Sequence, residues 1–482
     1  MGLLGILIAL GLLIWFAYRG WSVLLLAPAA AVLAAALAGQ PLLAHWTQTF
    51  MESAARFVAQ FFPIFLLGAL FGKLMEDSGS VTSIAKYMTE RLGPQRAVLA
   101  VVLAGAIVTY GGVSLFVAFF VLAPMAHQLF RSAAIPRRLM PGAIALGTTT
   151  FTMSALPGSP AIQNAIPMPF FGTTPFAAPG LGIIAAIVMF GFGMWWLGRA
   201  ERNARAKGEG YGEEAPQKDA AEDLLVRERA TTASSFDPPE AIHGSLSDAG
   251  PPIALAALPL VIVVAVNLLM SLIVLPRMDA SFLAKPEWGS TSLGAVGGVW
   301  AVVTALFAAA IVLIAINYRR LPALRDSMDA GANASVLPVL SVASLVGFGS
   351  VVAALPAFAA VRDWVLGIEG GPLVSLAVAT NVLASLTGSA SGGLTIALDA
   401  LGSTYLKIAH EHGIDPGLLH RVAVIGAGTL DTLPHNGAVV TLLAVCNSTH
   451  RESYLDIVMV SIVGGLLALA VVIILGSMVG SF

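Results

Sequence analysis

Long apolar runs alternate with short polar connections along most of the chain, and ten of these runs are long enough to cross a bilayer as a helix. Such a crossing needs about 20 residues. The first run has no basic start and a second run follows it at once, so we interpret it as a span rather than a signal peptide. The pattern predicts an all-α polytopic membrane protein. The runs are Gly2–Tyr18, Trp21–Gly39, Arg56–Met75, Leu139–Leu156, Pro179–Gly198, Pro252–Leu275, Leu293–Asn317, Gly331–Leu355, Leu418–Cys446 and Tyr454–Gly480.

Two further apolar stretches, Ala97–Phe130 and Pro372–Ala409, are too long for one crossing and too short for two complete ones. Each has a glycine-rich interruption near its middle, at Thr109–Gly112 and at Thr387–Gly393. Irregular backbone is tolerated at membrane depth only where protein buries it or water reaches it. We therefore predict that each stretch forms a re-entrant hairpin.

The two halves of the chain repeat the same order of features. In each half a span with an internal proline, Pro63 or Pro338, precedes a short amphipathic stretch, a hairpin and a span that ends at Leu156–Pro157 or Leu433–Pro434. Each half then has five crossings and one hairpin, and an odd number of crossings gives the halves opposite orientations. We predict an inverted repeat, which many secondary transporters contain.

Composition excludes several other classes of protein. Of 482 residues, 57% are hydrophobic and 11% are charged, whereas about 25% of the residues in a soluble domain are charged. A soluble enzyme and a nucleic-acid-binding protein are therefore excluded, and the net charge of -2 indicates no strongly charged partner. Charged residues concentrate in residues 199–250, which we predict to be a hydrophilic linker between a first repeat, 1–198, and a second repeat, 251–482.

Basic residues indicate the orientation in the membrane. If the N-terminus is external and each hairpin returns to its own side, Arg131, Arg137, Arg138 and the linker are cytoplasmic, while Arg56 and Arg421 are external. This arrangement places more Lys and Arg in the cytoplasm, as the positive-inside rule requires. We expect external N- and C-termini and a cytoplasmic linker.

Four interruptions supply candidate binding groups: the two hairpin tips and the stretches Pro157–Pro160 and Pro434–Gly437. Each begins a short helix, whose N-terminus attracts anions, and glycine lets a ligand approach the backbone. Ser159 and Asn436 resemble helix N-caps. Hairpins entering from opposite sides bring their tips together near the midplane, and the resulting small polar pocket suits a hydroxylated carboxylate. The candidate binding residues are Thr109, Gly111, Gly112, Ser114, Gly158, Ser159, Asn164, Thr387, Gly388, Ser389, Ser391, Gly392, Asn436 and Gly437.

Ionisable residues inside apolar runs are costly and usually functional. Asp431 and His435 are four residues apart, and we interpret them as a proton-linked pair, against the alternative that each only hydrogen-bonds the broken backbone. For Asp399 we expect a structural or helix-capping role. We expect no metal site, no cofactor and no catalytic residue.

Several motifs resemble those of the gluconate permease family, and the resemblance covers nearly the whole chain outside the linker. They are Phe62–Gly68, Met75–Gly79, Ser389–Ala397, Leu418–Ala423 and Asp431–Leu443. The most specific is the Asp-Thr-Leu-Pro-His-Asn-Gly run that starts at Asp431. The resemblance implies a proton-coupled symporter of the bacterial-type cytoplasmic (inner) membrane. It would import a gluconate-like sugar acid or a short hydroxy acid such as 3-hydroxybutyrate.

Through the wider ion transporter superfamily, the resemblance also implies a homodimer that works by an elevator motion. Gly2–Gly39 and Pro252–Asn317 then belong mainly to the scaffold. The hairpins and the broken spans form the moving transport domain, and the amphipathic helices act as arms. The implied partners are a small organic anion, a proton and the lipid bilayer.

Three alternatives stay open at this point. A sodium-coupled carboxylate symporter could use the same scaffold, since Ser, Thr and Asn oxygens bind Na⁺ readily. An intramembrane hydrolase could use Ser391 as nucleophile and His435 as base. A channel would show conductance instead of saturable transport.

Overall fold

The computed structural model describes residues 2–19, 21–212, 250–434 and 436–482. Within these ranges the chain is built from helices and the loops between them, with no strand. Most of the predicted linker and His435 lie outside the described residues. The prediction of an all-helical chain is confirmed for the described part.

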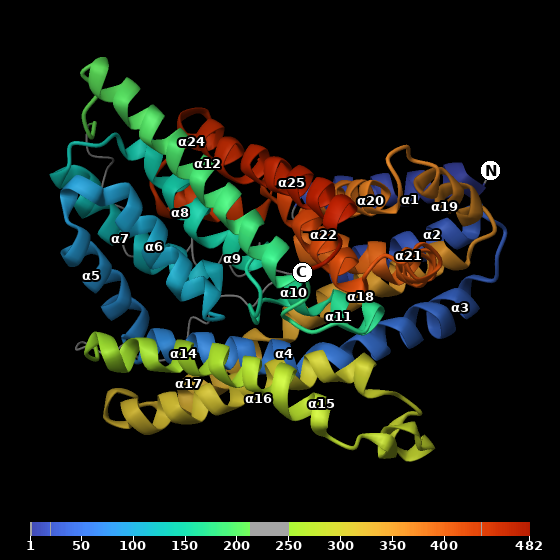
Figure 1. Cartoon of the computed structure of the whole chain (residues 1–482). Helices are drawn as coiled ribbons and strands as arrows, with labels where there is room; N and C mark the ends of the chain where they lie inside the picture. Colours follow the sequence, from blue (N-terminus) through green and yellow to red (C-terminus); the bar gives the residue numbers. More distant parts are fainter. Residues whose placement is uncertain (1, 20, 213–249, 435) are drawn as a thin grey trace.

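Figure 1 shows the helices of both halves, coloured along the chain. The main helices of the first half are α1 (Gly2–Tyr18), α2 (Val23–Leu37), α4 (Met51–Asp77), α5 (Ser80–Leu92), α6 (Ala97–Tyr110), α7 (Leu115–Ser132), α8 (Met140–Thr148), α9 (Phe151–Ser154), α10 (Ile162–Ala165), α11 (Pro167–Phe171) and α12 (Pro179–Ala206). Those of the second half are α14 (Ile253–Leu269), α16 (Leu293–Asn317), α17 (Leu324–Ala334), α18 (Val336–Ala354), α19 (Phe358–Leu366), α20 (Pro372–Thr387), α21 (Ala390–His412), α22 (Pro416–Thr429), α23 (Gly437–Val445), α24 (His450–Ile457) and α25 (Gly464–Val479). The order of long helix, short amphipathic helix, helical pair and interrupted helix occurs in each half.

Several helices are long and apolar enough to cross a membrane. Among the described residues, seven meet this condition by length and composition, or up to eight when the bent pair Ser80–Leu92 and Pro94–Tyr110 counts as one span. The predicted Gly2–Tyr18 and Trp21–Gly39 spans form the shorter helices α1 and α2. Helix α12 runs on to Ala206, beyond the expected end of its apolar run at Gly198.

The predicted span Leu139–Leu156 is not one helix, so that expectation was wrong. The helix is interrupted at Thr149 and Thr150, between α8 and α9. Thr149 Oγ1 donates to Ala145 O at 2.9 Å, and Thr150 Oγ1 donates to Leu146 O at 2.7 Å. Such hydroxyl bonds to the preceding turn bend and weaken a helix. The run Leu418–Cys446 is also divided, into α22 and α23, around the break that its proline predicted.

Each of the two long apolar stretches forms a pair of antiparallel helices. In the first pair, a Cβ built on Gly105 of α6 lies 3.3 Å from Leu122 Cδ1 of α7. In the second pair, a Cβ on Gly393 of α21 would lie 2.2 Å from the Ala384 nitrogen of α20, so glycine is required for this close approach. The prediction that the chain reverses direction at both glycine-rich interruptions is confirmed.

The long helices α4 and α18 lie in contact with each other and connect the two halves. Helix α4 also contacts α16 and α17, and α18 contacts α2 and α21. Figure 1 shows α14, α16 and α17 beside α4, with α5, α6 and α7 grouped at one end of this layer. The amphipathic stretches fold as the helices α5 and α19, and α5 buries Val81 and Ile84 while making a bend of 102° with the segment Pro94–Tyr110.

Candidate functional site

The first hairpin tip, between α6 and α7, packs closely against two other segments. Gly112 has φ +96°, and a Cβ there would lie 2.8 Å from Pro160 Cγ in the first break. A Cβ on Gly111 would lie 2.3 Å from Leu260 Cδ2 of α14. Both glycines therefore permit close packing of the tip, and Gly112 also provides a backbone conformation that other residues rarely adopt.

Two polar side chains flank this tip. The Ser114 Oγ accepts a hydrogen bond from the Phe116 N–H at 3.3 Å and so caps α7. Thr109 is buried, and its Oγ1 lies 3.2 Å from Thr152 Oγ1 of α9. The tip is thus joined by hydrogen bonding to the interrupted helix that follows it.

The first break, residues 155–161, is held by backbone contacts. Gly158 has φ +78°, its N–H donates to Pro175 O at 2.8 Å, and its carbonyl accepts from Asn267 Nδ2 of α14 at 3.0 Å. Ser159 is not a helix N-cap, so that expectation was wrong. Its Oγ accepts from the Ala161 N–H at 3.4 Å in a local turn, and α10 begins one residue later.

Asn164 belongs to a buried hydrogen-bond network behind the first break. Its Nδ2 donates to Ser159 O at 2.9 Å and to Pro175 O at 3.0 Å. Its Oδ1 lies 3.1 Å from His420 Nε2 and accepts from Arg421 Nη1 at 3.4 Å. Both ends of the amide are therefore engaged by the protein.

Arg421 of α22 is fully buried within the protein. Its Nη2 donates to Ala177 O at 2.7 Å, and its Nη1 donates to Ser154 O at 3.2 Å. The guanidinium thus connects α22 of the second half to the chain on both sides of the first break.

The second hairpin tip is formed by a left-handed glycine and a capped helix. Gly388 has φ +65° and ends α20. The Ser389 Oγ accepts from the Gly392 N–H at 3.2 Å and lies 3.3 Å from Ser391 Oγ. Thr387 Oγ1 donates at 2.8 Å to the carbonyl four residues earlier. Ser389 is therefore the N-cap of α21.

Asn436 connects the second tip to the second break. Its Oδ1 accepts from the Ala438 N–H at 2.7 Å, so the expected N-cap of α23 is confirmed. Its Nδ2 donates to Gly388 O at 2.7 Å and to Asp431 Oδ1 at 2.9 Å. The predicted partner of Asp431, His435, lies outside the described residues.

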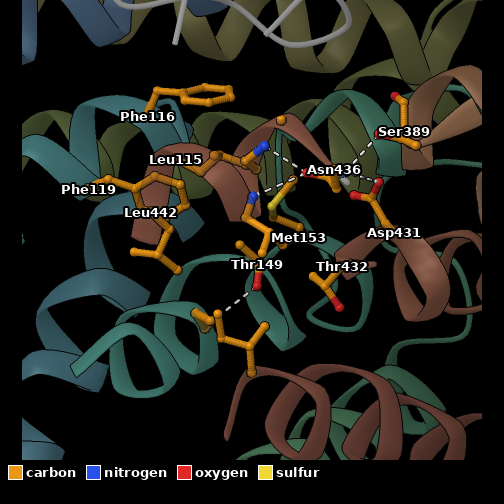
Figure 2. A pocket seen from close by; sticks show the side chains of 16 residues that line it. Leu115, Phe116, Phe119, Thr149, Met153, Ser389, Asp431, Thr432, Asn436 and Leu442 are labelled. Atoms are coloured by element: carbon orange, nitrogen blue, oxygen red, sulfur yellow. Dashed lines mark hydrogen bonds between the residues drawn. The ribbon is translucent and has the colours of Figure 1, made fainter. Parts of the chain in front are cut away.

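A cavity lies where these parts meet, and Figure 2 shows Asn436 beside Ser389 and Asp431, with its hydrogen bond to Asp431 drawn as a dashed line. Its lining atoms enclose about 550 Å³, open solvent at its mouth included. The first half supplies Leu115, Phe116, Phe119, Ala145, Thr149 and Met153. The second half supplies Gly388, Ser389, Asp431, Thr432, Asn436, Gly437, Ala438, Val439, Leu442 and Ile457. We call this space the central cavity; among its described lining residues, Asp431 is the only ionisable one.

A neighbouring cavity of about 570 Å³, measured in the same way, lies between the first tip and the first break. Leu115 and Met153 line both cavities. Thr109, Gly112 and Ser114 line this neighbouring cavity, together with Gln163.

The structure divides the predicted binding residues into three groups. Those in the central cavity are Gly388, Ser389, Asn436 and Gly437. Those in the neighbouring cavity are Thr109, Gly112 and Ser114. Those lining neither of these cavities are Gly111, Gly158, Ser159, Asn164, Thr387, Ser391 and Gly392.

Sequence reasoning missed the apolar and threonine walls of the central cavity. Phe116 and Phe119 of α7 stack edge to face at 5.9 Å between ring centroids, and Thr149 and Met153 lie at the interruption between α8 and α9. The run of three threonines from Thr148 was a usable signal, since consecutive hydroxyls inside an apolar run compete for helix carbonyls.

The described residues form an all-helical membrane fold with two helical hairpins and two interrupted helices around a cavity, and comparisons with solved structures show the same fold. The fold is similar to that of the YdaH transporter of Alcanivorax borkumensis, with a TM-score of 0.55 and 16% identity, over 90% of this chain and 89% of that one. It is also similar to MtrF of Neisseria gonorrhoeae, described among antimetabolite efflux pumps, with a TM-score of 0.53 and 13% identity, over 90% of this chain and 85% of that one.

Sequence comparisons give the family. The chain belongs to the GntP permease family: residues 1–200 match the model described as GntP family permease. It is 42% identical over 472 residues to YxjC of Bacillus subtilis (strain 168), an uncharacterised transporter, with 96% of each chain covered. It is 38% identical over 106 residues to the high-affinity gluconate transporter of Escherichia coli (strain K12), covering 21% of this chain and 23% of that one. Because these relatives are transporters, the chain is not an enzyme, and the hydrolase alternative is rejected.

Proposed function

We propose that this protein is a proton-coupled secondary symporter that imports a small hydroxylated carboxylate, such as a gluconate-like sugar acid or 3-hydroxybutyrate. The observation that carries the proposal is the central cavity, where Asp431 lies beside the capped N-termini of α21 and α23. The similarity of part of the chain to a gluconate transporter supports the substrate class.

The helix ends provide the proposed anion site. Ser389 and Asn436 cap α21 and α23, and Asn436 Nδ2 donates to Gly388 O, so the two N-termini are held together. Helix N-termini favour a negative group through their dipole and amides. The Thr432 hydroxyl lies at the cavity wall, and Thr149 Oγ1, which donates to Ala145 O, can still accept a hydrogen bond from a hydroxyl group of the substrate. We assign the predicted binding residues of the central and neighbouring cavities to this site.

Asp431 gives the physical reason for proton coupling. An ionised Asp431 would repel a carboxylate bound in the same cavity, whereas a protonated Asp431 would not. Proton binding and anion binding then favour each other, and this reciprocity is what symport requires. His435 remains the proposed partner of Asp431 in proton transfer.

The proposed mechanism is an elevator motion of an inverted repeat, with residues 1–198 and 251–482 as the repeats and 199–250 as a cytoplasmic linker. Matching contacts in the two halves support the repeat: α4 of the first half packs on α16, and α18 of the second half packs on α2. The hairpins with the interrupted helices would move against the long helices, with α5 and α19 as arms. We propose a homodimer in the bacterial inner membrane, with external N- and C-termini.

Uptake into proteoliposomes tests this function. Labelled gluconate and labelled 3-hydroxybutyrate serve as probes, with the lumen made alkaline. We expect accumulation that requires the pH gradient, and Asp431→Asn should remove the gradient dependence. Asp329→Asn, on the exposed surface of α17, is the matched control and should behave as the parent protein. Gradient-independent uptake by the parent protein, or gradient-driven uptake by Asp431→Asn, would contradict the coupling.

Sodium coupling is the competing function, because the oxygens of Ser389, Thr432 and Asn436 line the same cavity as the Asp431 carboxylate. Oxygen ligands from broken helices bind Na⁺ in other transporters. Replacing Na⁺ with choline at a constant pH gradient separates the two. Uptake that stops in choline would establish sodium coupling.

A further inference from the structure

A third polar cavity lies apart from the proposed substrate site, between the long helices α4 and α18 and the hairpin arm α21. Its atoms enclose about 900 Å³, open solvent included. We call it the lateral cavity. Its lining is Ser53, Arg56, Phe57, Gln60, Phe61, Phe170, Val346, Ser350, Ala353, Thr395 and Asp399. It has no lining residue in common with the central cavity, so the substrate site does not explain its polar groups.

Asp399 supplies the acid of this cavity. It lies in the middle of α21, so of the two roles expected from the sequence, helix capping or a structural role, capping is excluded. The Ser350 Oγ of α18 donates a hydrogen bond to Asp399 Oδ2. This bond joins the α20–α21 hairpin to the long helix α18. It therefore depends on the position of the hairpin relative to α18.

The charges that face Asp399 leave it without a dedicated counter-ion. From α4, Arg56 lines the cavity, but its side chain is 73% exposed and its Nη2 lies 3.5 Å from Glu52 Oε1. The described lining residues from α18 and α11 are uncharged. Along α21 itself, the next ionisable residue is Tyr405, whose hydroxyl lies 2.6 Å from Ser375 Oγ of α20. The next charged residue is Lys407, two turns from Asp399, which pairs with Glu411 at 3.9 Å. Asp399 therefore has a neutral hydrogen-bond donor and one exposed cation that is shared with Glu52. A carboxylate in such surroundings within an apolar helix is a candidate for reversible protonation.

Helix α21 connects this acid to the substrate cavity. Ser391, Thr395 and Asp399 are spaced by four residues and so lie on one face of the helix. The Thr395 Oγ1 donates to Ser391 O at 2.7 Å, and Ser391 Oγ lies 3.3 Å from the cap Ser389. A change at Asp399 therefore acts on the same rigid helix whose N-terminus lines the central cavity.

We propose that Asp399 is a proton-binding site in the lateral cavity, and that its protonation allows the α20–α21 hairpin to move along α4 and α18. The ligand is a proton that enters through the lateral cavity. The proposal rests on the proposed symport and adds a second titrating group to it, distinct from Asp431.

The mechanism follows from the cost of moving charge. While ionised, the carboxylate is held by the Ser350 hydroxyl and attracted by Arg56, and moving it past the apolar surface of α18 is unfavourable. When protonated, it loses the attraction to Arg56 and its charge no longer opposes movement. Protonation thus releases the hairpin, and deprotonation holds it at α18.

A substrate-free labelling experiment tests the site. Two single-cysteine variants are made on the full chain with Cys446→Ala. The thiol of Ala353→Cys measures the accessibility of the lateral cavity. The thiol of Asn333→Cys, on the exposed surface of α17, measures the effect of pH on the thiol reaction alone. The rate of modification by a water-soluble methanethiosulfonate is measured for each, and their ratio is followed from about pH 5 to about pH 8. We expect the ratio to change by about tenfold with a single midpoint.

Substitutions then assign the midpoint. In Asp399→Asn the ratio of modification rates should not vary with pH and should equal the value of the parent protein at acid pH. In Asp399→Glu the ratio should again vary with pH, with a midpoint at a different pH from that of the parent protein. Ser350→Ala removes the donor to the ionised form and should raise the midpoint pH, which keeps the proposal testable if Asp399→Asn does not fold. A parent-like profile in Asp399→Asn, or a ratio that depends on Na⁺ at constant pH, would overturn the proton site.

The result is separable from the proposed function. A flat labelling profile together with gradient-driven uptake would refute the Asp399 site and support the symport. An intact, Asp399-dependent profile without uptake of gluconate or 3-hydroxybutyrate would refute the proposed substrate and support the proton site.

Discussion

At the scale of single residues, the buried guanidinium of Arg421 shows how one side chain can organise an interrupted helix. Its hydrogen bonds reach Ser154 before the first break and Ala177 after it, while Asn164 and His420 complete the network. Backbone carbonyls that leave a helix need donors, especially where no water is available. The second half thus supplies donors for the broken backbone of the first half.

We predict that Arg421→Met destabilises the protein by about 2–5 kcal/mol, because buried carbonyl oxygens lose their donors. Arg421→Lys should be intermediate, since one ammonium group cannot reproduce the forked contacts of a guanidinium. The measurement is the melting temperature in detergent. Arg325→Met, whose parent side chain is 92% exposed, is the control and should leave the melting temperature unchanged. Equal melting of the Arg421→Met and parent proteins would contradict the assigned role.

Sequence reasoning succeeded for residues whose role is local and failed for residues whose role depends on distant partners. Asn436 has the residue type and position of a cap, and it caps α23. Ser159 has the same signature, but its oxygen binds the Ala161 N–H in a turn because the helix starts later. The buried network of Arg421 was not predicted, since nothing near it in the sequence shows that its guanidinium meets Ala177 and Ser154.

At the scale of elements, the α20–α21 hairpin depends on the close contact of its two arms at Gly393. A Cβ at this position would lie 2.2 Å from a backbone nitrogen of α20, and backbone cannot move aside as a flexible side chain can. We predict that Gly393→Ala separates the arms and lowers the melting temperature, with a cost of about 1–3 kcal/mol or more. Its matched control is Gly191→Ala in α12, where nothing lies within 4 Å of the new Cβ.

The control substitution should be neutral or stabilise α12 by up to about 1 kcal/mol, because alanine favours a helix more than glycine does. Similar melting temperatures for the Gly393→Ala and Gly191→Ala proteins would show that the arms tolerate separation. Fluorescence-detected size-exclusion chromatography after heating measures the melting temperature of both variants in the same assay.

A second element-scale feature holds the end of α12 to its neighbours. Arg138 Nε donates to Glu209 Oε1 at 2.7 Å, and Arg138 Nη1 lies 3.3 Å from Asp456 Oδ2 of α24. The hydrogen bond from Arg138 lowers the pKa of Glu209 below its ordinary value. The ionised form is thus favoured in the folded protein, and the stabilisation is present above the unfolded pKa and lost as the pH falls through the folded one.

We predict that Glu209→Gln lowers the melting temperature by about 1–2 °C at pH 7, a small effect because the pair is partly exposed. The difference from the parent protein should vanish at acid pH, below the lowered pKa of Glu209. Melting curves over this pH range check the prediction. A difference that persists in acid would mean that packing, not charge, accounts for the effect.

Hydropathy and glycine positions predicted both helical hairpins, since a reversal inside an apolar stretch requires permissive backbone. They did not predict the interruption between α8 and α9. Nothing in the apolarity of Leu139–Leu156 marks it, and the hydroxyls of Thr149 and Thr150 weaken the helix by bonding to its own carbonyls. The length and mean hydropathy of the run could not show this competition, although the three consecutive threonines from Thr148 indicated it.

At the scale of the whole molecule, the proposed opposite entry of the two hairpins can be mapped directly. In a Cys446→Ala background, single cysteines replace exposed residues at the open ends of each hairpin. We predict that Gln95→Cys and Ser132→Cys react from the cytoplasmic face, while Glu369→Cys and His412→Cys react from the external face. An impermeant maleimide applied to oriented membranes provides the measurement. Labelling of Gln95→Cys and Ser132→Cys from opposite faces would show that α6 and α7 form a continuous crossing.

The matching order of helices in the two halves could be predicted from the sequence, because apolar runs and their breaks recur in the same order even where the residues of the two halves differ. The contacts between halves were not visible, because they join positions far apart in the chain, such as α4 with α16 and α2 with α18. The lateral cavity belongs to this second kind of feature, since it needs α4, α18 and α21 together.

The divided ownership of the central cavity has an evolutionary consequence. Part of its lining comes from Leu115–Met153 and part from Gly388–Ile457, so neither half of the gene encodes the whole of the proposed recognition surface. A change of preferred solute then demands compensating exchanges on both sides, one in each segment. Natural relatives that transport a different organic acid should carry such paired exchanges. A library that randomises only one segment should give smaller changes in substrate specificity than a library that randomises both.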